Sequence, residues 1–176
     1  MNRVNLYIGV LSHGVRKQNG AYGWVLESVR ENGERDPRTI DNIAVRENVT
    51  DRDLVLEAIA ESLGRLNTSC EVTVYLDPEY LVEVFPTPWQ QGWVDEWEKN
   101  GWKTSKGADV KNADLWKKAA PVLRRNFVDY KKTSAMNSYR NWIYSEMKSA
   151  LRRNYGDCGD SEKSEAAENK NFAKIV

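Results

Sequence analysis

The chain has 176 residues, of which 26 are Lys or Arg and 26 are Asp or Glu, so its formal net charge is zero. Its length and its 40% hydrophobic content predict one globular domain with a sizeable core, and no apolar run approaches the ~18 residues of a membrane span. Two cysteines, Cys70 and Cys158, and the single His13 are too few for a disulfide framework or a zinc site. We therefore expect a cytoplasmic, reduced protein with no secretory signal and no membrane partner.

Three strands are predicted before residue 50. Residues 4–11 are almost continuously apolar and lead into a glycine-bearing loop, which is typical of a buried strand. Residues 20–29 alternate apolar and polar side chains, and residues 38–45 form a third candidate strand, so an antiparallel meander is expected. The middle of the first strand, around Gly9, holds no acidic side chain.

A helix and a fourth strand follow the meander. Thr50 is a favoured N-cap residue, and apolar side chains recur with helical spacing over residues 56–66. Residues 70–77, CEVTVYLD, form a compact strand that is rich in β-branched side chains and ends in Asp77. A strand that is reached through a helix is expected to pair in parallel with an earlier strand.

Residues 89–118 contain five of the seven tryptophans of the chain. Trp89, Trp93 and Trp97 are spaced four residues apart. Side chains with this spacing lie above one another on a helix, so we predict that the three rings stack along one helical face.

The C-terminal third of the chain holds the remaining elements. Residues 126–130 form a candidate fifth strand, and residues 137–153 form a last helix with an apolar side. Residues 154–176 are small, charged and poor in apolar side chains, which predicts a flexible tail. The organisation expected is one domain over residues 1–153 followed by that tail.

Charge is unevenly distributed along the neutral chain. Residues 117–153 hold ten basic side chains against only Asp129 and Glu146. Such a basic stretch favours an acidic partner such as a phosphate backbone. The alternative interpretation is an ordinary solvated helix surface.

Several segments resemble the type 1 ribonuclease H family. They are GAYGWVL, CEVTVYLDPEYL and, above all, GWVDEWEKNGWKTSKGADVKNADLWKK, which is similar to the Trp-rich "handle" of bacterial members. The resemblance covers residues 4–152. It implies an α/β fold with a five-stranded mixed sheet, in which three antiparallel strands are followed by parallel additions. Helices flank this sheet, and the handle lies here at residues 89–118.

The resemblance also implies an activity and a metal site. Family members cleave the RNA strand of an RNA–DNA hybrid with two magnesium ions that four carboxylates hold. The motifs place Gly9, Val55 and Asn141 at three of these positions and leave Asp77 as the only acid. One carboxylate does not offset the repulsion between two dications, so no intact catalytic set, no bound metal and no cofactor are expected.

Three functions remain open on this sequence. The leading hypothesis is a catalytically inactive ribonuclease H-like domain, a pseudo-ribonuclease H, that binds nucleic acid or acts as a scaffold. The first alternative is an active RNA–DNA hybrid ribonuclease with a rearranged magnesium site, in which another acid joins Asp77; the candidates are Asp53, Glu57, Glu79 and Glu146. The second alternative is a scaffold that binds only a protein partner.

Binding of an RNA–DNA hybrid or another nucleic acid is expected to be weak and sensitive to salt. Some candidate residues follow from the family match and others from their charge or aromatic character. They are Thr50, Arg52, Trp97, Trp102, Lys103, Lys131, Lys132 and Arg140. The handle itself is nearly neutral, with six lysines against five acids, so its tryptophans are expected mainly to pack together.

Overall fold

A computed structural model describes residues 1–12, 18–29, 32 and 35–156. Its elements are β1 (Asn2–Leu11), β2 (Gln18–Val29), β3 (Arg35–Val49), α1 (Asp51–Leu63), β4 (Cys70–Asp77), α2 (Leu81–Val84), α3 (Thr87–Gln90), α4 (Trp93–Lys99), α5 (Ala113–Arg125), β5 (Phe127–Lys132) and α6 (Ser138–Tyr155). No described helix is long and apolar enough to cross a bilayer. The predicted tail lies, from residue 157 onward, outside the described residues, as does His13.

The five strands form one mixed sheet in the order β3-β2-β1-β4-β5. β1 pairs antiparallel with β2, and β2 pairs antiparallel with β3, whereas β4 is parallel to both β1 and β5. This arrangement confirms the predicted fold. β3 is longer than predicted, and β5 is shifted toward the C-terminus relative to residues 126–130.

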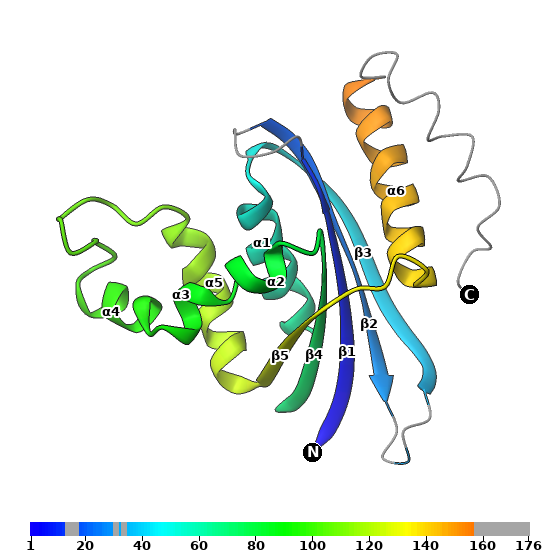
Figure 1. The fold of residues 1–176 in the computed structure, drawn as a ribbon, viewed down its shortest axis with the longest axis horizontal. Coiled ribbons are helices and arrows are strands. Elements are labelled where there is room, and N and C mark those ends of the chain that lie inside the picture. The colour runs from blue at the N-terminus through cyan, green and yellow to red at the C-terminus, as the bar shows by residue number, and fades with distance from the viewer. Residues whose placement is uncertain (13–17, 30–31, 33–34, 157–176) are drawn as a thin grey trace.

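Helices cover the sheet on both sides, with α1 and α5 on one face and α6 on the other (Figure 1). Successive side chains of β1 point to opposite faces of the sheet, so this strand contributes to the contacts with helices on both sides. Leu6 and Ile8 join the larger core with the helix α1, while Tyr7 packs into a smaller core with Ile143 and Met147 of α6. Residues of odd number in β1 therefore face α6.

The N-terminus of α1 is fixed by the predicted cap. The Thr50 hydroxyl accepts a hydrogen bond from the backbone N–H of Asp53 at 3.3 Å, and the Asp53 carboxylate accepts one from the backbone N–H of Thr50 at 2.9 Å. This reciprocal capping box satisfies two backbone donors that the helix itself leaves unpaired.

The predicted stack of Trp89, Trp93 and Trp97 along one helix is wrong for Trp89 and holds for the other two, whose ring centroids lie 6.5 Å apart on α4. Trp89 belongs to α3, and Gly92 then adopts a left-handed φ of 73° that ends this run before α4 begins. Trp97 also packs against Trp116 of α5, with ring centroids 6.4 Å apart, and Trp93 is 46% exposed. The tryptophans therefore pack within the handle and against α5, as expected. They come from two short helices, α3 and α4, and not from one long helix.

Candidate functional site

Three of the four positions that the family match identified meet where β4 ends beside α6. Gly9 of β1 pairs with Asp77 of β4, and Asp77 lies on the α6 face because Tyr7 and Tyr75, two residues earlier, stack there at 4.8 Å. Asn141 lies in the first turn of α6. Val55 is separate: it is fully buried in the larger core on α1.

Arg140 binds the one remaining acid. Its Nε donates to Asp77 Oδ2 at 3.2 Å, and its Nη1 donates to Asn141 Oδ1 at 3.0 Å. The guanidinium carbon also lies 4.8 Å from the ring centroid of Tyr144. The Asp77 and Arg140 side chains are 14% and 28% exposed, so a positive group of the chain itself neutralises the acid in a partly dry environment.

Tyr144 adds a neutral donor to this pair. Its hydroxyl donates to the Val10 carbonyl oxygen at 3.4 Å and lies close to the Asp77 carboxylate. Burial first, and then the negative charge of Asp77, raise the pKa of the Tyr144 hydroxyl above its ordinary value. The sequence offered no sign of this role, because an aromatic residue on an amphipathic helix is normally assigned to packing.

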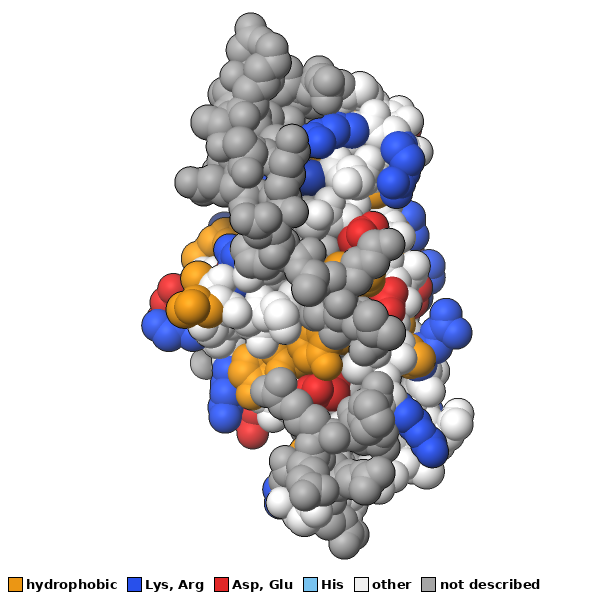
Figure 2. Space-filling model, turned by 90° about the vertical axis from the view of Figure 1, so that its right-hand side faces the viewer, with side chains coloured by type: hydrophobic (Ala, Val, Ile, Leu, Met, Phe, Trp, Pro, Cys, Tyr) orange, Lys and Arg blue, Asp and Glu red, His pale blue; other side chains and the backbone are white. Residues whose placement is uncertain are grey.

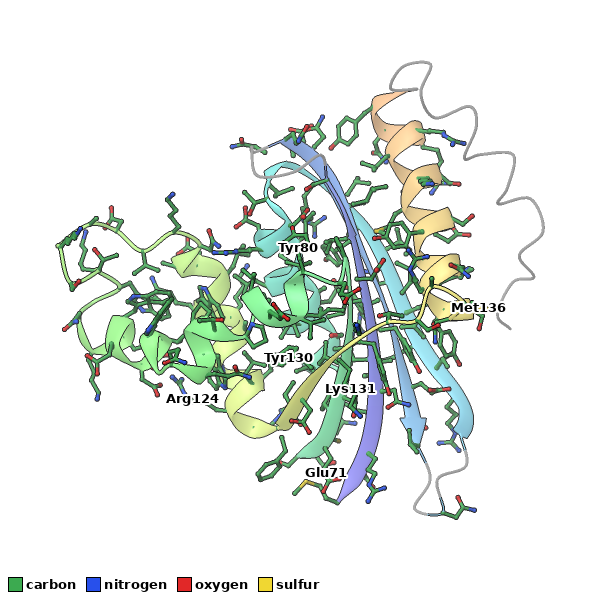
Figure 3. All side chains as sticks on the ribbon, in the orientation of Figure 1. Glu71, Tyr80, Arg124, Tyr130, Lys131 and Met136 are labelled. Atoms are coloured by element: carbon green, nitrogen blue, oxygen red, sulfur yellow. The ribbon has the colours of Figure 1, made fainter. Side chains whose placement is uncertain are left out.

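A second carboxylate, Asp51, lies near the site and was missed as a site residue. It is buried at the first turn of α1, where it accepts hydrogen bonds from the hydroxyls of Ser12 and Tyr80. Figure 3 shows Tyr80 beside α2, on the opposite side of β1 from α6. Burial, followed by the bond to Asp51, raises the pKa of the Tyr80 hydroxyl. Asp51 is thus held by neutral donors and makes no contact with Asp77 in the described structure.

Side chains of α6 crowd the position that a Cβ would take at Gly9. A Cβ at Gly9 would lie 2.9 Å from Ile143 Cγ2 and 3.3 Å from Met147 Cε, and a Cβ at Gly23 would lie 2.7 Å from Ile143 Cγ2. Ile143 therefore fills a notch that Gly9 and Gly23 form in the sheet. α6 approaches the sheet closely because both residues lack a side chain.

The residues present do not fit a pair of magnesium ions. Asp77 is engaged by Arg140, the notch at Gly9 is filled with apolar atoms, and Val55 is in the core. Among the described residues, no group of three or more His, Cys, Asp or Glu side chains is arranged to hold a metal. Hard dications require several convergent oxygens, which this site does not offer.

None of the four acids proposed to rebuild the site contacts Asp77 in the described structure, and three of them bind other groups. Asp53 caps α1, Glu57 binds Arg46 at 3.0 Å, and Glu79 binds Lys132 at 2.8 Å. No contact joins Glu146 to Asp77 in the described part of the chain. The observed packing therefore gives the rearranged site no second carboxylate beside Asp77.

The basic stretch of residues 117–153 does not form one surface. Its first part lies on α5 and its last part on α6, and the sheet separates these helices (Figure 1). Figure 2 shows the α6 side, where most of the visible Lys and Arg side chains lie toward the edges and visible apolar side chains lie nearer the middle. The sequence run therefore overstates the local positive field.

The residues predicted to contact nucleic acid also lie on both faces of the sheet. The handle residues Trp97, Trp102 and Lys103 lie on the α5 side, and Lys103 is bound to Asp109. Thr50 is used in the capping box, while Arg52 is exposed in the first turn of α1. These residues do not gather around Asp77.

Two other predicted contacts do lie on the α6 face. Arg140 binds Asp77 directly, and Lys131 is exposed beside Tyr75 in the β4–β5 register. Lys132 follows with the opposite orientation and binds Glu79. The site therefore combines one bound guanidinium and one exposed ammonium on a single face.

Raising the pH above about 10 is expected to destabilise the fold. Burial is the main cause that raises the pKa of the Tyr22, Tyr80 and Tyr144 hydroxyls, and an adjacent carboxylate adds to it in each case. A raised pKa means that the neutral form stabilises the folded state fully below the unfolded pKa of about 10, and that this contribution is lost as the pH rises further. Denaturation midpoints and tyrosinate absorbance measured together test this. Complete tyrosine ionisation in a still-folded protein would contradict it.

Comparison with known proteins agrees with the fold. The family model for RNase H matches residues 5–143. A relative named Ribonuclease H from Caldicellulosiruptor saccharolyticus is 36% identical over 111 residues, which cover 60% of this chain and 74% of the relative.

Solved structures show the same fold at lower identity. LC9-RNase H1, a type 1 RNase H with the type 2 active-site motif, is 21% identical with a TM-score of 0.61 and covers 94% of this chain and 81% of its own. The foamy viral protease-reverse transcriptase in complex with RNA/DNA hybrid is 13% identical with a TM-score of 0.54, over 80% of this chain and 19% of the viral chain.

Proposed function

The chain belongs to the RNase H family, and from this premise we propose that it binds nucleic acid without cleaving it. The observation that carries the proposal is the Arg140 guanidinium bound to Asp77. A guanidinium supplies positive charge and hydrogen-bond donors, but it does not lower the pKa of a bound water as a metal ion does. The domain is proposed to keep a phosphate-facing site and to lack the chemistry of hydrolysis.

The nucleic-acid partner is supported by the family and by a structural neighbour that was solved with an RNA/DNA hybrid. The alternative, an active hybrid ribonuclease, draws support from relatives that are named Ribonuclease H and from a neighbour whose active-site motif differs within the type 1 fold. The packing at Gly9 and the engagement of Asp77 weigh against this alternative. A scaffold that binds only protein would follow if no nucleic acid bound.

Incubation with a labelled RNA–DNA hybrid is expected to yield no cleavage products with either magnesium or manganese. The C. saccharolyticus relative serves as the positive control, and Asp77→Asn serves as the matched control for contaminating nuclease. Activity present in the unmodified chain and absent from Asp77→Asn would contradict the proposal. Millimolar magnesium is also expected to leave Tm unchanged, because ligands stabilise only a fold that binds them.

A further inference from the structure

We propose that Arg140 and Lys131 together form a metal-independent anchor for one phosphodiester group of a bound nucleic-acid strand. This inference rests on the proposed function and assigns the chemistry of its contact. The anchor lies at the carboxyl end of β4, on the face that α6 covers. In it, cationic side chains take the place that metal ions have in the active family site.

The guanidinium of Arg140 is held in a fixed position. Asp77 binds Nε, Asn141 binds Nη1, and the ring of Tyr144 lies against its plane. Nη2 has no hydrogen-bond partner among the residues that the structure describes, and the side chain is 28% exposed. A guanidinium that is already oriented loses little entropy when its free edge binds two phosphate oxygens.

Lys131 supplies a second positive charge on the same face. It pairs in register with Tyr75, whose ring stacks on Tyr7 under α6, so the pleat places Lys131 on the side of Asp77. The Lys131 side chain is exposed, and the described structure gives it no ion-pair partner. Lys132 differs, since its ammonium is bound to Glu79.

The charges around Arg140 leave a net preference for an anion. Asp77 offsets Arg140, whereas Lys131 remains uncompensated within the described residues. The N-terminus of α6 adds a partial positive charge, because its first N–H groups point toward this end of the helix. Asp129 is exposed two residues before Lys131 on the same face of β5, and no ion pair joins the two among the described residues. Asp51 is held by two hydroxyl donors.

The affinity for a short labelled RNA–DNA hybrid, measured by fluorescence anisotropy at about 50 mM salt, tests the anchor. Affinity is expected to be the same in magnesium and in a chelator. Arg140→Met is expected to weaken binding roughly tenfold and to lower the salt slope by about one. Arg153→Met is the matched control: Arg153 is exposed in the last turn of the same helix, and its loss is expected to change affinity less than about threefold.

Three further variants test the anchor and separate binding from folding. Arg140→Met leaves Asp77 without its cation, so Asp77→Asn/Arg140→Met restores a neutral pair and is expected to bind more tightly than Arg140→Met but more weakly than the unmodified chain. Asp77→Asn alone removes a repelling charge but keeps an acceptor for Nε, and is expected to raise affinity roughly threefold. Lys131→Met is expected to weaken binding less than Arg140→Met, because its ammonium is not pre-oriented.

The outcomes distinguish this inference from the proposed function. Equal losses in Arg140→Met and Arg153→Met, or binding that needs magnesium, would overturn the anchor even if the hybrid stayed uncleaved. Hybrid cleavage that depends on Asp77 would overturn the proposed function itself. Failure of the unmodified chain to bind hybrid at all would overturn both in favour of a protein partner.

Discussion

Gly9→Asp is expected to lower the free energy of unfolding by roughly 4 kcal/mol. The new Cβ would lie 2.9 Å from Ile143 and 3.3 Å from Met147, and the carboxylate would enter an apolar cluster beside Asp77. Steric overlap, desolvation and like-charge repulsion all act in the same direction. Equilibrium denaturation with urea measures the change.

The contribution of the notch can be separated from that of the charge. Gly9→Ala adds the Cβ alone and is expected to cost about 1–3 kcal/mol. In a double-mutant cycle, Gly9→Asp combined with Ile143→Ala should destabilise less than the sum of the two single changes, because the removed methyl groups are those that the new Cβ meets. Strict additivity, or a cost of Gly9→Asp below about 1 kcal/mol, would show that the notch is not tightly filled.

Val55→Glu is expected to be destabilising by a similar amount, roughly 4 kcal/mol, for a different reason. Val55 is fully buried, so the carboxylate would lose its hydration, and no described cation lies in the core around it. Thermal and urea denaturation of the variant measure this cost.

Asn141→Asp provides the matched comparison, because it also restores an acid at a family position. Asn141 already accepts a hydrogen bond from Arg140 at 3.0 Å, so the added charge faces a cation and is expected to change stability by less than about 0.5 kcal/mol. Equal costs for Val55→Glu and Asn141→Asp would contradict the burial argument. Together, these variants would show that an acid is costly at the buried position 55 and tolerated at position 141, where it faces Arg140.

Local sequence signals predicted most of the fold. The strand at residues 70–77 was bounded correctly because a β-branched run starts after a polar turn and ends at a proline. Thr50 was identified as the cap of α1 from its side-chain chemistry alone. The strand order followed from the family resemblance and from the expectation that a helix connects parallel strands.

The details of the site depended on packing between distant segments. The spacing of Trp89, Trp93 and Trp97 suggested one helix, but the left-handed backbone of Gly92 interrupts it. The pairing of Arg140 with Asp77 joins α6 to β4 and has no local signal, since an arginine in the first turn of an amphipathic helix is normally solvated. Sequence reasoning thus predicted which family positions lack an acid, whereas the structure was needed to show what surrounds these positions.

The close fit of Ile143 between Gly9 and Gly23 also restricts the evolutionary routes open to this domain. A mutation that reinstated the first acid would meet selection against misfolding before any gain of activity arose. A smaller residue at position 143 would have to be fixed beforehand, although it offers no catalytic benefit by itself. The tight contact between helix and sheet therefore opposes the gain of an acid at position 9 through single substitutions, because the first variant on that route would be less stable.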